Sequence, residues 1–337
     1  MKTIKLSALA LIAFFSIAFS SCNEEEATPL GIPNPAASSI AAQLSAIPDY
    51  SILKQALVKT DLLTTLTESG EYTLFAPKNA SFTTFLAANG FANIDAVPTV
   101  ALKQILLYHV LPGRKSSDNI ETPIGYYKTL AFDASSLDFL SLYIYRTAPL
   151  AASIPKINGS VNAVGANINA SNGVIIVVDK VIPFQTVVSM LSLNPDLSKL
   201  VTLATDGTQA DVVTALTTTA TKTVFAPTND AFTAALTTTS TTTGFLVGNV
   251  TQPNVNSVLK YHVTAGSQKA STLTNGLIVN TFLTMPTLKT FKISNVSGVV
   301  KIIDAANLPV VKAVTNADIT CTDGIIHIID GVLNPIL

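Results

Sequence analysis

The chain has 337 residues, of which 48% are hydrophobic and 12% charged, and its formal net charge is −1. A chain this apolar does not have the composition of a disordered protein, and its few, mixed charges exclude the basic surface that nucleic-acid binding requires. The length exceeds that of a usual single domain and predicts two domains, each large enough to bury its own core.

Residues 1–21 have the pattern of a secretory signal peptide. Lys2 and Lys5 precede an apolar stretch from Leu6 to Phe19, and small residues follow it. The apolar stretch is too short and wrongly flanked for a membrane-spanning helix. We therefore expect a cleaved signal peptide and an exported protein.

Cys22 stands directly at the expected cleavage site. Small residues followed by cysteine resemble the bacterial lipoprotein signal, in which the cysteine sulfur is acylated, although FSSC has Phe where that pattern usually has Leu. The alternative is an ordinary signal with an incidental cysteine. Acylation of Cys22 implies attachment to a membrane without spanning it.

Residues 22–37 have no hydrophobic periodicity, and we interpret them as an acidic, proline-rich tether. Glu24, Glu25 and Glu26 lie just behind the cysteine. Such a cluster resembles the signal that sends some lipoproteins to the outer face of the outer membrane. The expected location is therefore the outer membrane, lipid-anchored and exposed on the cell surface.

The first elements after the tether are a helical region and a joint between a strand and a helix. In SILKQALVKTDLLTTLTESG (51–70) leucines recur at helical intervals. In TLFAPKNASF (73–82) a strand leads through Phe75 to Pro77, which ends donation to the sheet, and Asn79 is predicted to cap the following helix. Phe82 is expected to face the core.

The later elements are a second helix and a hairpin. VPTVALKQILLYHVLPG (97–113) predicts an amphipathic helix that stops before Pro112, so Tyr108 and His109 lie near its end. NGVIIVVDKVIP (172–183) begins with a hairpin-turn signal and continues as an apolar, β-branched strand. Helices followed by strands indicate an α+β layout.

These landmarks return in the second half of the chain, in the same order. The matching strings are TVFAPTNDAF (223–232), Tyr261-His262-Val263 and DGIIHIIDGVLNP (323–335). The sequence therefore contains two copies of one unit.

With its two copies of this three-part signature, the chain resembles a tandem pair of fasciclin domains. The resemblance implies fasciclin-like domains at residues 38–184 and 185–337, each a β-sandwich or wedge of two sheets flanked by short helices. The first copy departs from the signature at Ile176 and Lys180, where the second has His327 and Gly331. We expect neither departure to alter the fold.

The sequence predicts no enzyme active site, metal site or cofactor. The three histidines include His109 and His262, which occupy equivalent places in separate domains and cannot easily share a metal ion. No GxSxG, HExxH, CxxC, P-loop or GxGxxG motif is present. Asp179 and Asp330 are expected to accept backbone hydrogen bonds, and Cys321 is expected to be a buried, unpaired residue.

We interpret the repeated motif residues as mainly structural, while the resemblance also implies a possible receptor-binding role for the Tyr-His region. They are Phe75, Pro77, Asn79, Tyr108, His109, Phe225, Pro227, Asn229, Tyr261 and His262.

The resemblance implies a non-enzymatic surface lipoprotein that mediates adhesion by binding an extracellular protein or matrix. The alternative is an accessory glycan-binding lipoprotein of a polysaccharide uptake system, which needs exposed aromatic rings. The chain has no Trp and only 8 Tyr. The candidate glycan contacts are Tyr126, Tyr127, Tyr143 and Tyr145, although a cross-strand aromatic pair with a packing role explains them as well.

Overall fold

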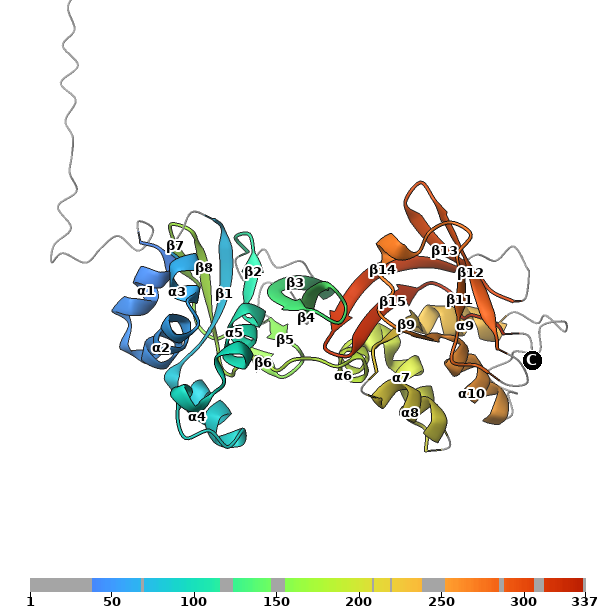
Figure 1. Ribbon diagram of the computed structural model, residues 1–337, viewed down its shortest axis with the longest axis horizontal. Helices are drawn as coiled ribbons and strands as arrows, with labels where there is room; N and C mark the ends of the chain where they lie inside the picture. The colour runs from blue at the N-terminus through green and yellow to red at the C-terminus, as the bar shows by residue number, and fades with distance from the viewer. Residues whose placement is uncertain are drawn as a thin grey trace, which may run out of the picture. The chain divides into compact units, whose positions relative to one another are not determined.

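The computed structural model describes residues 38–67, 70–115, 124–146, 155–207, 209–218, 220–237, 252–284, 288–305 and 312–335. From Pro35 onward the chain forms one compact unit, which contains the two copies of the repeated arrangement (Figure 1). The signal peptide, Cys22 and the tether lie outside the described residues.

Five α-helices lie in the described part of the first domain. The helices are α1 Ile40–Ala46, α2 Ser51–Lys59, α3 Leu62–Thr65, α4 Asn79–Ala88 and α5 Thr99–Tyr108. The leucine pattern of residues 51–70 is divided between α2 and α3, because Asp61 between them has a left-handed backbone with φ of 58°. Leu53 and Leu57 are both buried, as their helical spacing predicts.

Two four-stranded sheets complete the first domain. The first has the order β2-β1-β8-β7, and the second the order β3-β4-β5-β6. Their strands are β1 Tyr72–Pro77, β2 Val110–Pro112, β3 Ile124–Asp133, β4 Asp138–Tyr145, β5 Lys156–Ile157, β6 Val161–Asn162, β7 Ile168–Ala170 and β8 Gly173–Val178. Strands β7 and β8 form the predicted hairpin, and β8 runs parallel to β1.

Strand β1 divides the interior of the first domain into two cores. Because successive side chains of a strand point to opposite faces, Leu74 and Ala76 pack with the helices while Phe75 packs between the sheets. Ile175 and Ile176 of β8 are divided in the same way. The buried residues on both faces explain why β8 is apolar throughout rather than alternating.

The second domain repeats the order of helices and strands. Its helices are α6 Val187–Leu193, α7 Ser198–Thr205, α8 Ala210–Thr217, α9 Asn229–Thr237 and α10 Gln252–Tyr261. Its strands are β9 Lys222–Pro227, β10 Val263–Ala265, β11 Ile278–Asn280, β12 Thr290–Val296, β13 Val299–Ile303, β14 Lys312–Cys321 and β15 Gly324–Ile329. The α+β prediction is confirmed for both domains.

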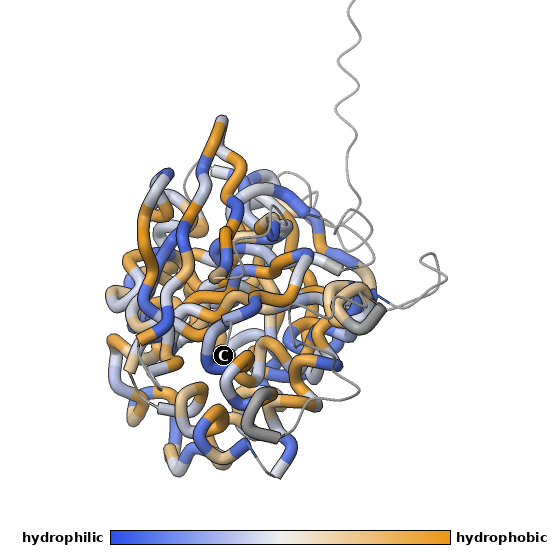
Figure 2. Tube along the Cα trace, turned by 90° about the vertical axis from the view of Figure 1, so that its right-hand side faces the viewer, coloured by the Kyte–Doolittle hydropathy of each residue, from blue (hydrophilic) through white to orange (hydrophobic). Residues whose placement is uncertain are grey.

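The sheet of the second domain differs from that of the first, because its strands form one sheet of seven in the order β10-β9-β15-β14-β13-β12-β11. The long strand β14 pairs with both β13 and β15, and its register shifts at Asn316. Such irregularities bend a strand, so one strand serves both layers of the wedge. Apolar and polar residues are interspersed along the chain, as expected for elements with one buried face (Figure 2).

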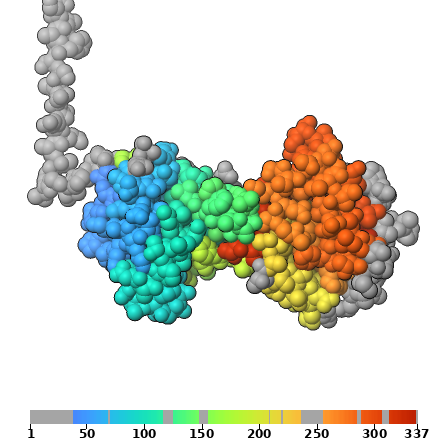
Figure 3. All heavy atoms as spheres, viewed as in Figure 1, coloured from blue at the N-terminus to red at the C-terminus, as the bar shows by residue number. Residues whose placement is uncertain are grey.

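The β3–β4 hairpin contacts strand β14 of the second domain, and their surfaces meet in Figure 3. The Thr320 N–H donates to Ser141 Oγ at 3.0 Å. The Thr320 hydroxyl accepts from Lys128 Nζ at 2.6 Å and donates to Asp138 Oδ2 at 3.1 Å. Burial raises the pKa of Asp138, but the hydrogen bond and positive charge of Lys128 outweigh it and leave this pKa below its ordinary value.

Candidate functional site

The repeated histidines each connect a helix end to the last segment of their domain. His109 follows the end of α5, and its Nδ1 lies 2.7 Å from the Ile105 carbonyl oxygen. Its Nε2 accepts a hydrogen bond of 2.8 Å from the Ile182 N–H. Because an N–H can only donate, Nε2 carries no proton, and Nδ1 donates to Ile105.

His262 makes the same pair of hydrogen bonds in the second domain. Its Nδ1 lies 2.7 Å from the Val258 carbonyl oxygen, and its Nε2 accepts from the Leu333 N–H at 2.9 Å. Burial lowers the pKa of both His109 and His262 to about 4. Both rings are therefore neutral at physiological pH, with both nitrogens engaged within the fold, so the structure gives them a structural role.

The tyrosines that precede these histidines are also engaged internally. The Tyr108 hydroxyl donates to the Ser141 carbonyl oxygen at 2.9 Å, and the Tyr261 hydroxyl donates to the Thr290 carbonyl oxygen at 2.6 Å. Burial raises the pKa of both tyrosines. The hydroxyls join the ends of α5 and α10 to strands β4 and β12, which explains why Tyr recurs with His.

The remaining polar residues of the C-terminal motif also have structural partners. His327 is buried in β15, where its Nε2 lies 2.7 Å from the Gln268 carbonyl oxygen and its Nδ1 accepts from the Asp318 N–H. Asp179 accepts from the Asn162 N–H, and Asp330 accepts from the Ala313 N–H. The expected backbone hydrogen bonds of both carboxylates are therefore present.

Asn79 and Asn229 do not cap the helices that follow them, which corrects the sequence prediction. Asn79 is the first residue of α4, and its Oδ1 instead accepts from the Ile52 N–H in the first turn of α2. Asn229 Oδ1 accepts from the Lys199 N–H of α7 in the same way. Each asparagine thus satisfies a free N–H of an earlier helix, which sequence-local reasoning could not find.

The phenylalanines and prolines of the repeated motif have the predicted positions. Phe75 and Phe225 are fully buried, and Pro77 and Pro227 end β1 and β9. Phe82 and Phe232 are 1% exposed, as expected for core residues. The motif therefore builds the joint between strand and helix in both domains.

The candidate glycan contacts are brought together, but two of them are buried. Tyr126 and Tyr143 are direct partners across β3 and β4, with ring centroids 5.1 Å apart. Tyr143 is 1% exposed and packs in the core of the second domain, and Tyr127 is 8% exposed. Tyr127 and Tyr143 thus lack the free ring face that sugar stacking needs, because packing already covers both rings.

The other two tyrosines of this group are half-buried, Tyr126 and Tyr145. The Tyr126 hydroxyl accepts from Asn194 Nδ2 at 2.9 Å, a contact between the first domain and the loop after α6. The cross-strand aromatic pair with a packing role is therefore the arrangement that the structure contains.

Sequence reasoning missed a surface at the turn between β3 and β4, which we call the hairpin tip and define as Phe132, Leu137 and Phe139. These side chains are 43%, 66% and 42% exposed, and the two Phe rings pack edge to face at 5.5 Å. Leu137 has a left-handed backbone with φ of 52°. The apolar residues in FDASSLDF were the available signal, but spacing alone does not tell an exposed strand face from a buried one.

The turn of the hairpin tip is held by hydrogen bonds. Asp133 Oδ2 accepts from Ser135 Oγ, from the Ser136 N–H and from Ser136 Oγ, at 2.6, 2.8 and 2.7 Å. Lys269 of the second domain donates to the Leu137 carbonyl oxygen at 3.0 Å. The tip therefore presents its apolar side chains from an ordered backbone, so little further ordering is needed for binding.

The described residues contain neither a metal-binding cluster nor a membrane-spanning helix. Within the described ranges no group of three or more His, Cys, Asp or Glu residues could hold a metal ion. No helix in that part of the chain is long and apolar enough to cross a membrane. Cys321 is buried and unpaired, and burial raises its thiol pKa.

The chain is similar in sequence and in structure to known proteins. The fasciclin domain family matches the chain at residues 48–183 and 195–335, which is most of its length. Protein sll1483 of Synechocystis sp. (strain ATCC 27184 / PCC 6803 / Kazusa) is 35% identical over 133 residues, which cover 40% of this chain and 66% of that protein. The chain thus spans slightly less than two thirds of that relative's length.

A FAS1 domain pair from the insect cell adhesion molecule fasciclin I is similar in structure. The TM-score is 0.50 and the sequence identity 18%, and the match covers 83% of this chain and 94% of that one. A similarity at this level of identity shows the shared fold, and it extends over both domains.

Proposed function

Because the chain belongs to the fasciclin-domain family and carries two such domains in tandem, we propose that it is a lipid-anchored surface protein that mediates adhesion through the hairpin tip. Fasciclin domains are known in cell-adhesion proteins, and the similar solved structure comes from one. The family is generally non-enzymatic. The repeated polar motif residues are engaged inside each domain, so the partner must be bound elsewhere.

The observation that carries this proposal is the exposure of two Phe rings and one Leu on an ordered turn. Interfaces between proteins are rich in aromatic side chains at their centre, and a few such anchor residues contribute most of the binding energy. The left-handed backbone of Leu137 is energetically unfavourable and brings no benefit to a turn that is only solvated. Such strained residues are concentrated at functional positions. These features fit a protein or matrix partner better than a polysaccharide.

The adhesion proposal predicts that residues 35–337 bind immobilised matrix proteins and that the variant Phe132→Ser/Leu137→Asn binds at least about tenfold more weakly, the effect of losing anchor residues. Asn accepts the left-handed backbone of position 137, so the turn is retained. Biolayer interferometry on an array of matrix proteins and polysaccharides measures the change.

Val100→Ser is the matched control, because Val100 is a 78% exposed apolar residue on α5. Its affinity should stay within about twofold of the unmodified protein, as is usual for surface substitutions. Binding that survives the tip variant would contradict the proposed surface. Binding to polysaccharides alone would favour the glycan accessory.

The anchoring part of the proposal depends on Cys22, which lies outside the described residues. The full chain expressed in a Gram-negative host should partition with the outer membrane and incorporate radiolabelled palmitate, whereas Cys22→Ser should do neither, because it has no sulfur to acylate. An unmodified chain recovered without lipid in the soluble fraction would overturn the anchor. Protease accessibility on intact cells tests the exposed orientation.

A further inference from the structure

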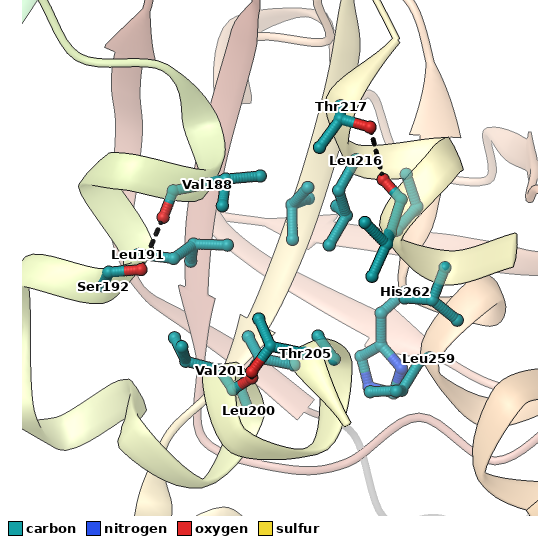
Figure 4. Close-up of a pocket in the computed structure, with 15 residues that line it drawn as sticks. Val188, Leu191, Ser192, Leu200, Val201, Thr205, Leu216, Thr217, Leu259 and His262 are labelled. Carbon is teal, nitrogen blue, oxygen red and sulfur yellow. Dashed lines mark hydrogen bonds between the residues drawn. The ribbon is translucent and has the colours of Figure 1, made fainter. Parts of the chain in front are cut away.

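The second domain contains an apolar hollow between its helices and its sheet (Figure 4). Its walls come from α6, α7, α8 and α10, and its floor from β9 and β10, and its cavity volume is about 50 Å³. Leu191, Leu200, Leu216, Leu259 and Val224 line it, and each is at least 93% buried.

Among the described residues that line this hollow, none offers a hydrogen-bonding group in its depth. His262 lies at the wall, but both its nitrogens are bonded to the backbone, at Val258 and Leu333. Water in a cavity needs two to four polar partners, so it is poorly held here. A polar ligand group would be equally unfavourable in the depth of the hollow.

The mouth has a different character, because exposed hydroxyl groups surround it. Ser192, Thr205 and Thr217 each donate to the carbonyl oxygen four residues earlier in the same helix, at 2.9, 2.8 and 2.8 Å (Figure 4). Their oxygen atoms retain the capacity to accept a hydrogen bond from water or from a ligand. The hollow therefore combines an apolar depth with a hydrated rim.

The first domain shows how the same position can be filled. Asn79 bonds Ile52 of α2 and Asn229 bonds Lys199 of α7, which aligns the two helices residue by residue. In this alignment Ala204 takes the place of Leu57, which is 1% exposed within the core of the first domain. The second domain thus has a smaller side chain where the first has a core-filling one.

We propose that this hollow is a binding site for the saturated hydrocarbon chain of a single-chain amphiphile, with its polar end at the hydroxyl rim. The methyl end of the hydrocarbon chain would contact the leucines of α6, α8 and α10, because this end needs no hydrogen bond. This site lies in the second domain and is separate from the hairpin tip, so it does not depend on the proposed adhesion function.

The test is binding of octanoate, decanoate and dodecanoate to residues 35–337, measured by calorimetry below their micelle concentrations. Each methylene that enters the hollow should strengthen binding about fourfold, until the hollow is full. A lysophosphatidylcholine with a ten-carbon chain forms the second arm and separates a phospholipid source from a free fatty acid. Binding by neither amphiphile, or binding independent of chain length, would overturn the proposal.

Ala204→Leu should fill the hollow and weaken decanoate binding at least about tenfold, comparable to losing two buried methylenes. Ala210→Leu makes the same change at an exposed position at the start of α8 and should leave the affinity unaltered. Equal affinities of the two variants would contradict the assigned site.

Methyl NMR of the unmodified protein keeps the test decisive if Ala204→Leu does not fold. Decanoate should shift the methyl signals of Leu191, Leu216 and Leu259, while those of Leu53 and Leu57 in the first domain stay in place. Shifts confined to residues outside the hollow would overturn the assignment.

Discussion

Acidification from pH 7 to pH 4 is expected to lower the free energy of unfolding by about 3 kcal/mol for each of His109 and His262, as follows from a pKa depressed from its ordinary value to about 4. The neutral ring is required because Nε2 accepts a backbone N–H in both domains. A proton on this nitrogen would remove the hydrogen bond and leave a charge in the core.

The direction of this effect follows from which state binds the proton first. In the unfolded chain a histidine titrates near its ordinary pKa of 6.5, whereas His109 and His262 titrate at about 4 in the folded protein. The stabilisation is therefore complete above pH 6.5 and is lost progressively between pH 6.5 and pH 4. His327, whose pKa burial also lowers, acts in the same direction.

Urea unfolding of residues 35–337 at intervals between pH 7.5 and pH 4 measures this loss, and His109→Gln/His262→Gln is the matched variant. Glutamine can donate and accept in place of the ring but does not titrate, so the variant should have a flatter pH profile. Because the pKa of Asp138 is lowered, its ionised carboxylate stabilises the fold at pH values above the ordinary carboxyl pKa. This stabilisation is lost only as the pH falls below that range. A profile unchanged by the substitution would show that other groups cause the acid sensitivity.

Asp323→Asn is expected to destabilise the second domain by about 3 kcal/mol, the usual effect of removing one member of a buried ion pair. The Lys222 side chain is fully buried, and its Nζ lies 2.9 Å from Asp323 Oδ2. Without the carboxylate, the ammonium keeps neutral partners such as the Thr218 carbonyl oxygen, which do not compensate its charge. Urea unfolding at pH 7 gives the change.

Lys222→Met/Asp323→Asn is the informative control, because it removes both charges together and should cost less than Asp323→Asn alone. The first domain supports this expectation, since Asn172 Oδ1 accepts from the Ile40 N–H as Asp323 Oδ1 accepts from the Val187 N–H. An amide at this position is thus compatible with the fold. If the double variant were the less stable of the two, unpaired charge would not be the cause of the loss.

Features governed by short stretches of chain could be predicted from the sequence. The hairpin before β8, the end of α5 at Tyr108 and the burial of Phe82 follow from turn chemistry, proline and apolar spacing, all of which act within a few residues. The duplication is visible directly in the matching strings of the two halves. The sequence also predicted a structural role for His109 and His262, because equivalent residues in separate domains cannot easily share a metal ion.

The features that only the tertiary structure decided are those in which distant segments meet. Asn79 looked like a local cap, but its partner is Ile52 of another helix. Tyr143 is buried because the second domain packs against it, and the hollow beside Ala204 becomes visible only when four helices and two strands are assembled. Local propensity determined the elements of this protein, whereas packing between elements determined which side chains are covered, which remain exposed and where space is left.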